Sequence, residues 1–560
     1  MRLKCFAAAV TAVLACQASA QSPAQNLSTA NSSVPSLSAS RPSPPKLLLV
    51  ISIDQFSANL FDEYRSQFTG GLARIASGTV FHNGYQSHAL TETCPGHSTL
   101  LTGDHPARTG IINNIWVDQS IARADKSVYC AEDESQPGTS STSYKVSPKN
   151  LLVPTLGELM KQRWPGSRNV AVAGKDRAAV MMSGHIADQR WYWDGKTFST
   201  DLVGVPVPGI VPKFKAALAA SLAAPRGPLE PPPYCQSKAS PIPIEGGGKP
   251  VGAGQLSRAA GDLLAFRASP ELDGDTLALA AGLVDAMRLG HRAEPDLLSI
   301  SLSATDYVGH TYGTEGEEMC LQLLAIDREI GDFMRFLDSR GINYAVVLTA
   351  DHGGKDVPER ERLAGTADAA RVDPALSPGT MGKTLVTELG LPGPGLLGDA
   401  PYGDMYVDRH LSPADQQRVL ASAIRAYRRH PQVEAVFTSR AIAETPLPTT
   451  PPETWSLIER ARESYHAGRS GDFIVVLKKD VTPIADTHRS VATHGSVWDY
   501  DRRVPILFWR SGMHSATIDN SVDTVDIMPT LASEIGLPLA TGSVDGHCLS
   551  AVPGAQCRTR

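Results

Sequence analysis

Aspartate and histidine side chains that can bind metal ions lie in four short segments far apart in the chain. The candidate ligands are Asp54, Asp306, His310, Asp351, His352 and His494. A hydroxyl group at Thr93 precedes the Pro-Gly-His sequence of residues 95–97. Carboxylate oxygens and imidazole nitrogens are common zinc ligands, and two metal ions can activate a hydroxyl and stabilise a leaving oxygen. These residue types therefore indicate a two-metal site for phosphoryl transfer, with Thr93 as the candidate nucleophile.

The spacing within the segments supports a site. Asp306 and His310 are four residues apart with Gly309 between them, and a simple pair on a helix surface is the alternative interpretation. Asp351 and His352 are followed by two glycines, which let the backbone approach bound ligands closely. A single aspartate at a strand end is most often a turn or cap residue. The prediction therefore depends on several such aspartates occurring together with histidines.

Thr93 lies just before an expected helix whose first turn contains Pro95. A hydroxyl at that position is close to the free N–H groups and the partial positive charge of the helix, which favour a phosphoryl group. Thr91 is the nearest alternative nucleophile. Cys94 is less suitable, because no paired histidine or cation that would stabilise a thiolate is evident.

Buried strands and helices alternate along the chain and must position these residues. Continuous apolar runs at 46–52, 169–174, 297–303 and 343–350 are typical of strands buried on both faces. Helical patterns occupy 152–164, 274–290 and 316–341. The alternation predicts an α/β fold with a mainly parallel central sheet flanked by helices. Ligands bind beyond the carboxyl ends of such strands, where Asp54, Lys175, Asp306 and Asp351 are expected.

Two irregular stretches interrupt the alternation and predict inserted cap subdomains. The predicted order is catalytic core 46–185, insertion 186–270, core 271–354, an inserted α+β cap lobe 355–488, and core 489–560. In the last part, 504–510 is expected to rejoin the main sheet as a strand, and 524–538 to form a helix.

The N-terminus has the features of an export signal. Residues 1–20 combine Arg2 and Lys4 with a short apolar run and an Ala-Ser-Ala cleavage site. Lipidation at Cys16 is an alternative, and residues 21–45 are rich in Ser, Pro and Ala, as in a flexible tether. The sequence thus predicts a periplasmic or secreted protein, and no other run is long enough for a membrane span.

The composition and charge of the chain limit the classes of molecule that it is expected to bind. The chain has 560 residues and a net charge of −6, without the basic stripe expected of a nucleic-acid-binding protein. Six cysteines remain after the signal is removed: Cys94, Cys130, Cys235, Cys320, Cys548 and Cys557. Cys548 with Cys557 would close a short loop, and Cys130 with Cys235 would tie an insertion. The connectivity cannot be deduced from sequence alone, and no oligomeric state is indicated.

Several motifs together resemble the alkaline phosphatase superfamily. They are TETCPGHSTLLTG (91–103), GIINN (110–114), DYVGHTYG (306–313), ADHGG (350–354) and ATHGS (492–496). The resemblance is strongest to the branch of nucleotide pyrophosphatase/phosphodiesterases and threonine-type bacterial alkaline phosphatases. GKDR (174–177) is similar to the Lys-x-Arg element of the threonine-type monoesterases. The Asp-Ser-Ala segment of serine-type enzymes and an evident third-metal Mg²⁺ set are missing.

The resemblance implies a role for each candidate residue. Two zinc ions would be bound, one by Asp54, Asp351 and His352, and the other by Asp306, His310 and His494. Thr93 would be a metal ligand and the nucleophile. Asn114, Lys175 and Arg177 would contact the phosphoryl oxygens of the substrate.

The predicted function is that of an exported zinc-dependent alkaline phosphatase. It would hydrolyse small-molecule phosphate monoesters through a phosphothreonine intermediate and release inorganic phosphate. A phosphodiesterase or nucleotide pyrophosphatase on the same two-zinc scaffold is the alternative, against which Lys175 and Arg177 argue. A formylglycine sulfatase would need Cys-x-Pro-x-Arg, whereas this chain has Thr93-Cys94-Pro95. A metal-binding or adhesion domain without activity would not need the complete set of ligands and nucleophile.

Overall fold

The computed structural model describes residues 43–557. The expected signal peptide at 1–20, the alternative anchor Cys16 and residues 21–42 of the expected tether lie outside this range. Within it, no helix is both long enough and apolar enough to span a membrane.

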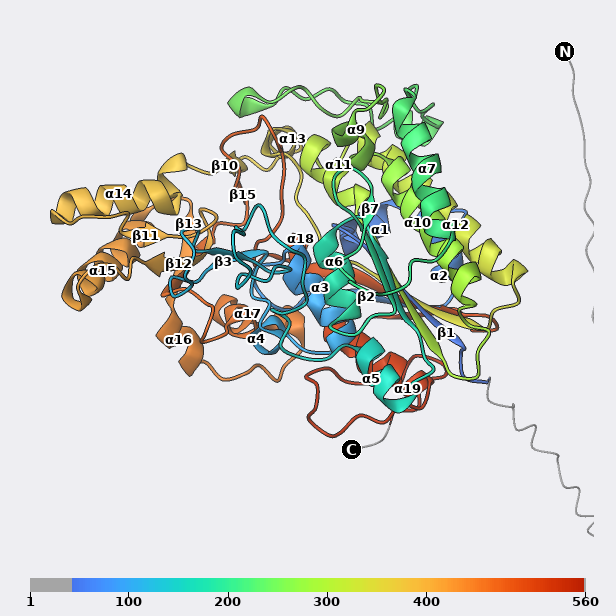
Figure 1. Cartoon of the computed structure of the whole chain (residues 1–560). Helices are drawn as coiled ribbons and strands as arrows, with labels where there is room; N and C mark the ends of the chain where they lie inside the picture. Colours follow the sequence, from blue (N-terminus) through green and yellow to red (C-terminus); the bar gives the residue numbers. More distant parts are fainter. Residues whose placement is uncertain (1–42, 558–560) are drawn as a thin grey trace, which may run out of the picture. The chain divides into compact units, whose positions relative to one another are not determined.

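A ten-stranded sheet forms the centre of the fold (Figure 1). Its strands run in the order β17-β2-β16-β9-β1-β8-β5-β6-β7, and β18 also pairs with β2. The strands are β1 Leu47–Ile53, β2 Thr79–Tyr85, β5 Asn169–Ala173, β6 Gln189–Trp193, β7 Phe198–Ser199, β8 Asp296–Leu302, β9 Tyr344–Thr349, β16 Arg503–Arg510, β17 Ala516–Ile518 and β18 Val522–Asp523. The neighbours from β9 to β6 are parallel, whereas β16 is antiparallel to β2 and β9. The mainly parallel α/β fold is therefore confirmed, and 504–510 does rejoin the main sheet.

Helices cover both faces of this sheet. On one face lie α2 Gly71–Ile75, α7 Ile210–Ala223, α10 Pro270–Met287 and α12 Glu317–Ser339. On the other lie α3 Thr93–Thr102, α5 Leu156–Arg163, α6 Asp176–Ser183 and α19 Ile527–Glu534. The helices predicted at 152–164, 274–290 and 316–341 correspond to α5, α10 and α12. The helix predicted at 524–538 begins with a 3₁₀ turn, Thr524–Asp526, and continues as α19.

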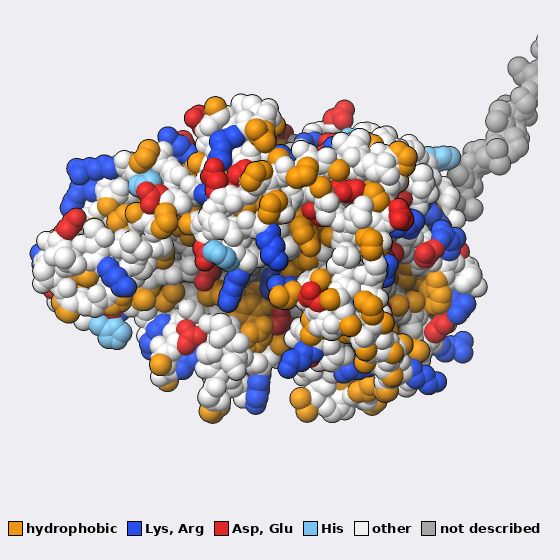
Figure 2. Space-filling view, turned by 90° about the horizontal axis from the view of Figure 1, so that it is seen from above, with side chains coloured by type: hydrophobic (Ala, Val, Ile, Leu, Met, Phe, Trp, Pro, Cys, Tyr) orange, Lys and Arg blue, Asp and Glu red, His pale blue; other side chains and the backbone are white. Residues whose placement is uncertain are grey.

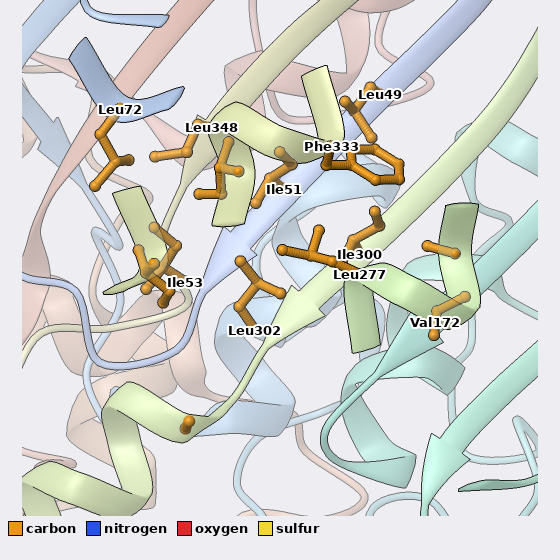
Figure 3. Packing of buried hydrophobic residues seen from close by; sticks show 14 of the residues in the cluster. Leu49, Ile51, Ile53, Leu72, Val172, Leu277, Ile300, Leu302, Phe333 and Leu348 are labelled. Atoms are coloured by element: carbon orange, nitrogen blue, oxygen red, sulfur yellow. The ribbon is translucent and has the colours of Figure 1, made fainter. Parts of the chain in front are cut away.

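The central strand β1 is buried on both faces because its sequence is apolar without interruption. Leu49, Ile51 and Ile53 point into the core shared with α10 and α12, where they lie near Leu302 and Phe333 (Figure 3). The alternate residues of β1 point into the core shared with α3, α5 and α19. Burying one large apolar side chain contributes roughly 1.5–3 kcal/mol, so packing on both faces fixes the end of this strand in place.

A second, four-stranded antiparallel sheet lies within the range predicted for the cap lobe. Its order is β11-β12-β14-β13. The strands are β11 Leu396–Leu397, β12 Gly403–Val407, β13 Val433–Thr438 and β14 Phe473–Leu477. The helices α14, Pro378–Leu389, and α15, Pro413–Arg429, pack with this sheet around a core of their own. This core is separate from those of the main sheet, as a folded lobe requires.

The predicted insertion at 186–270 begins with strands of the main sheet. β6 pairs in parallel with β5, and β7 continues the sheet at its edge. Trp191 and Trp193 of β6 point into the same core as β1. This strand, QRWYW, starts with polar residues and has no aliphatic run, so the sequence pattern did not reveal it. The main sheet therefore extends beyond the predicted boundary at 186.

Three disulfides join all six described cysteines. Cys548 pairs with Cys557, as expected. The suggested pairing of Cys130 with Cys235 is wrong, because Cys94 pairs with Cys130 and Cys235 pairs with Cys320. The fold brings Cys130, which follows β4 (Ser127–Tyr129), beside the start of α3. It also places the short helix α8, Pro233–Gln236, against α12. No pattern in the sequence predicts either of these contacts.

The face drawn in Figure 2 carries both signs of charge. Lys and Arg side chains are interspersed with Asp and Glu, and hydrophobic side chains lie between them. A hollow near the middle of this face has Lys and Arg side chains beside it.

Gly96 marks the closest approach of α3 to the end of β9. A Cβ atom added there would lie 1.9 Å from the carbonyl oxygen of Asp351. Only glycine allows the helix that begins at Thr93 to approach the backbone of Asp351 this closely.

We expect Gly96→Ala to destabilise the protein by about 1–3 kcal/mol, because α3 must shift away from β9. Thermal unfolding measures this as a lower Tm. Gly379→Ala in α14 is the matched control, because its added Cβ has no atom within 4 Å apart from its chain neighbours and the backbone of its own helix. There the gain in helix propensity should keep the Tm at or above that of wild type. A wild-type Tm for Gly96→Ala would contradict the close approach.

Candidate active site

The candidate residues converge because neighbouring parallel strands end at the same edge of the sheet. Asp54 follows β1, and Asp351 follows β9 after a single residue. Lys175 lies between β5 and α6. Asp306 lies in the first turn of α11, Ala304–Tyr312, which follows β8. The four side chains are buried, and they lie beyond the carboxyl ends of the strands, where they were expected from the sequence.

Lys175 lies at the centre of the group. Its Nζ is 2.6 Å from Oδ2 of Asp54 and 2.6 Å from Oδ2 of Asp306. The ammonium group also donates to the hydroxyl oxygen of Thr93 at 3.3 Å. One cation thus contacts both an aspartate of each predicted metal set and the candidate nucleophile.

The set of Asp306, His310 and His494 is brought together by the fold. Oδ1 of Asp306 lies 3.2 Å from Nε2 of His310 and 3.3 Å from Nε2 of His494. The Nδ1 atoms of the two histidines lie 2.9 Å from the carbonyl oxygens of Ala492 and Thr91, respectively. Donation from Nδ1 to a carbonyl leaves Nε2 free to bind a metal ion, as in many metal sites.

The set of Asp54, Asp351 and His352 is also assembled. Nε2 of His352 lies 3.4 Å from Oδ1 of Asp54 and 3.3 Å from Oδ2 of Asp351. Its Nδ1 faces the carbonyl oxygen of Gly353 at 2.8 Å. Asp306 borders this set too, because its ligand atom and those of Asp54 and His352 all lie within 4.8 Å of one another. Asp306 therefore lies between the two sets.

Unpaired polar atoms show that these residues fit a metal ion. Oδ1 of Asp54, Oδ1 of Asp306 and Nε2 of His352 are buried and have no hydrogen-bond partner within residues 43–557. Buried polar groups in proteins are normally paired, and an orphaned one costs free energy. A divalent cation bound by these atoms would satisfy all of them at once.

Burial and neighbouring charges shift the pKa values of the site residues in both directions. Burial, together with the nearby carboxylate of Asp351, raises the pKa of Asp54 well above its usual range. Burial acts in the same direction on Asp306, but the neighbouring His310 and Lys175 lower its pKa well below the usual range. Burial lowers the pKa of His352 to about 3, so its imidazole is neutral and able to bind a metal ion.

Thr93 is the first residue of α3, and its hydroxyl faces two cations. Its oxygen accepts from Lys175 and from Nη2 of Arg177, each at 3.3 Å. The hydroxyl of Thr91, the alternative nucleophile, instead donates to the carbonyl oxygen of Ser496 at 2.7 Å. Cys94 is held in a disulfide and has no thiolate to offer. The geometry therefore favours Thr93 among the three.

Asn114 lies beside the same helix start. Its side-chain oxygen accepts from the backbone N–H of Cys94 at 2.8 Å. This bond uses the oxygen of the amide and leaves the NH₂ group to donate elsewhere. All ten residues predicted from sequence thus gather around the start of α3 and the carboxyl ends of the main strands.

Comparison with known proteins places the chain in a family. Residues 48–497 match the family described as type I phosphodiesterase / nucleotide pyrophosphatase. The chain belongs to this family. Alkaline phosphatase PhoK of Sphingomonas sp is 52% identical over 515 residues, which cover 91% of this chain and 92% of PhoK. Alkaline phosphatase PhoD of Zymomonas mobilis is 48% identical over 512 residues, covering 91% and 88%.

A solved structure agrees with this assignment. The crystal structure of wild-type alkaline phosphatase PafA, a protein of Elizabethkingia meningoseptica, superposes with a TM-score of 0.78. The two chains are 25% identical, and the match covers 91% of this chain and 99% of PafA. The resemblance to the phosphodiesterase-like branch of the alkaline phosphatase superfamily is thereby confirmed.

The structure also shows residues that hold the site in place and that the sequence analysis did not identify. Oε2 of Glu92 accepts from the backbone N–H of Asn114 at 3.1 Å. The hydroxyl of Tyr402 lies 3.2 Å from Oε1 of Glu92 and 3.2 Å from the carbonyl oxygen of His494. Tyr402 thus links the 355–488 range to the start of α3 and to the His494 loop. Glu92 lies inside the TETCPGH motif and could have been found there, but nothing in the sequence marks Tyr402.

His97 supports the same helix from its inner side. Its Nδ1 lies 2.9 Å from the carbonyl oxygen of Thr93 and 3.1 Å from Oδ2 of Asp351. Its Nε2 lies 3.0 Å from the hydroxyl of Ser301 in β8. This buried imidazole connects α3 with the ends of β8 and β9.

We expect His352→Ala to lower the divalent metal content of the purified protein toward one ion per chain. Asp306→Ala should lower it further, because Asp306 lies between both ligand sets. Metal analysis after dialysis measures both effects. His410→Ala is the control, because the His410 side chain is 83% exposed and lies outside the site. Wild-type metal content in the His352→Ala protein would remove His352 from the ligands.

Proposed function

We propose that this protein is an exported zinc-dependent alkaline phosphatase that hydrolyses phosphate monoesters. The observation that carries this proposal is the hydroxyl of Thr93, held 3.3 Å from both Lys175 and Arg177 beside six potential metal ligands. The relatives PhoK and PhoD, which bear the name alkaline phosphatase, support the reaction class at 52% and 48% identity.

Each residue of the site has its own role in the proposed reaction. Thr93 Oγ attacks phosphorus and the alcohol leaves, which gives a phosphothreonine. Water then cleaves that ester, releases inorganic phosphate and restores the hydroxyl. Lys175, Arg177 and the NH₂ group of Asn114 donate to the non-bridging oxygens, and the start of α3 adds its dipole. His97 and Glu92 keep the nucleophile helix in position.

Zinc fits a donor set of carboxylates and imidazoles. Asp54, Asp351 and His352 would hold one ion, and Asp306, His310 and His494 the other. Bound zinc supplies a Lewis acid that lowers the pKa of a hydroxyl and stabilises a departing alkoxide. The same ligands accept other first-row divalent metals, so metal analysis and reconstitution with Zn²⁺, Mn²⁺ and Co²⁺ identify the active ion.

Export is supported by the cysteines. Every cysteine between residues 43 and 557 forms a disulfide. Such disulfides persist in oxidising compartments such as the periplasm and the extracellular space. They agree with the signal peptide predicted from residues 1–20, and we propose a periplasmic or secreted location.

Lys175 and Arg177 favour a monoesterase over a phosphodiesterase. A monoester dianion carries more negative charge on its non-bridging oxygens than a diester monoanion. Both cations are positioned to meet that charge: Lys175 is 3% exposed, and Arg177 is half-buried. Charge-assisted hydrogen bonds in such surroundings are worth roughly 1.5–3 kcal/mol each. The pair therefore selects the more highly charged ester.

We expect Thr93→Ala to lose nearly all turnover of p-nitrophenyl phosphate while it retains its metal and its Tm. Thr93→Ser should keep measurable activity, because a hydroxyl remains. Thr91→Ala is the matched control, since it deletes a neighbouring hydroxyl that faces Ser496. Near-wild-type rates in Thr93→Ala, with loss in Thr91→Ala, would show that Thr91 is the nucleophile. Steady-state kinetics and metal analysis give the answer.

Removing both cations should separate monoester from diester hydrolysis. In Lys175→Ala/Arg177→Ala, kcat/KM for p-nitrophenyl phosphate should fall by about 100-fold or more, from two lost charge-assisted bonds. The rate with bis-p-nitrophenyl phosphate should fall much less. Lys383→Ala/Arg425→Ala, which removes two exposed cations from α14 and α15, is the control. Equal losses with both esters, or a wild-type preference for the diester, would favour the phosphodiesterase alternative.

A further inference from the structure

We propose that Arg267 forms a second anion-binding position, which selects monoesters whose alcohol carries a carboxylate or another phosphate. This inference rests on the proposed phosphatase function and names the substrate class that the site prefers. The position lies on the open side of the site and is separate from the groups that contact the scissile phosphoryl group.

The exposure of the site residues shows where the alcohol must lie. Thr93 and Lys175 are 1% and 3% exposed, so they form the floor of the site. Asn114, Arg177 and Tyr307 are half-buried and form its open side. The phosphoryl group must reach the floor, so the alcohol portion of the ester extends toward these half-buried residues.

Arg267 lies against the ring of Tyr307, one of these half-buried residues. It is the last residue of the short helix α9, Leu263–Arg267, which runs close to α11 in Figure 1. Its guanidinium carbon is 4.7 Å from the centroid of the Tyr307 ring. Nζ of Lys175 is 5.1 Å from the centroid of the same ring. One aromatic ring therefore contacts both the cation on the floor and the cation at the opening.

The surrounding structure holds Arg267 at this place. The carboxylate of Asp262 caps α9 by accepting from the backbone N–H groups of Leu264 and Ala265 at 3.1 and 3.0 Å. Phe266 is 1% exposed and packs on Trp193, with ring centroids 4.9 Å apart. Tyr307 directly follows Asp306, so the ligand helix α11 fixes the ring. Arg267 thus extends from an anchored turn onto an anchored ring.

The guanidinium group remains available for a ligand. Arg267 is exposed, and within residues 43–557 it forms no ion pair with a carboxylate. The only acidic residue of its own turn, Asp262, is engaged at the opposite end of α9. A planar guanidinium group with free N–H donors matches the paired oxygens of a carboxylate or a phosphate.

The electrostatics around Tyr307 agree with this arrangement. The ring of Tyr307 lies within about 5 Å of two cations, with Lys175 at 5.1 Å and Arg267 at 4.7 Å from its centroid. Two positive charges therefore lie against one phenol group. Asp54 and Asp306 balance the charge of Lys175, whereas no carboxylate among the described residues forms an ion pair with Arg267. An ester with a second anionic group would supply the missing negative charge.

Matched aryl esters test this inference. We compare phenyl phosphate with its 3-carboxy, 4-carboxy and 4-trimethylammonio derivatives on the metal-loaded enzyme. The quantity measured is the ratio of kcat/KM for each derivative to kcat/KM for phenyl phosphate. Taking this ratio in each variant cancels the effect of the substituent on leaving-group reactivity.

In Arg267→Ala, the ratio for at least one carboxy derivative should fall about three- to five-fold, the size expected of one exposed charge pair. The ratio for the trimethylammonio derivative should rise. Arg267→Lys should restore part of the loss, and added salt should weaken the wild-type preference. Arg425→Ala, which removes an exposed arginine of α15, should leave every ratio as in wild type.

Other outcomes overturn the inference. Equal losses with all four esters would show that Arg267 only packs on Tyr307. Unchanged ratios would show that the alcohol does not reach it. A wild-type enzyme that cleaves none of the four esters would instead contradict the proposed phosphatase function, so the two failures are distinguishable.

Discussion

Negative charge buried at the carboxyl ends of three neighbouring strands is the constraint on which the rest of the site depends. Asp54, Asp351 and Asp306 follow β1, β9 and β8, and packing on both faces of the sheet keeps these strand ends fixed. Like charges this close in a buried place are costly unless cations accompany them. Lys175 supplies one positive charge, and the imidazoles and orphaned oxygens around it are suited to divalent ions.

The nucleophile helix is fitted to this charged centre by several independent contacts. Gly96 allows α3 to lie against the backbone of Asp351. The disulfide between Cys94 and Cys130 restrains the first turn, and His97 ties it to β8. The hydroxyl of Thr93 then needs no further movement to face Lys175 and Arg177. Positioning before the reaction matters because misplacement of a reacting group by about 1 Å can cost about 100-fold in rate.

Segments outside the main sheet supply the surroundings of the site. Tyr402, between β11 and β12, reaches Glu92 and the His494 loop. The range 186–270 supplies Arg267, which lies on the ring of Tyr307 at the opening. The strand ends hold the candidate ligands, while these added segments contribute residues that surround them. This division is common in α/β enzymes, where loops and insertions beyond the strand ends determine specificity.

The sequence by itself determined the fold class, the family and the identity of the residues that could do chemistry. Uninterrupted apolar runs predict buried parallel strands. The residue that follows such a run must lie at the carboxyl end of its strand. Asp54 and Asp351 could therefore be placed beside each other from sequence. Only the tertiary structure decided that Asp306 lies between the two ligand sets, that Cys94 pairs with Cys130, and that Tyr402 and Arg267 lie near the site. It also showed that QRWYW is a strand of the main sheet. Local patterns report which face of an element is buried, whereas contacts between distant segments depend on how whole elements pack, and no short stretch of sequence records that.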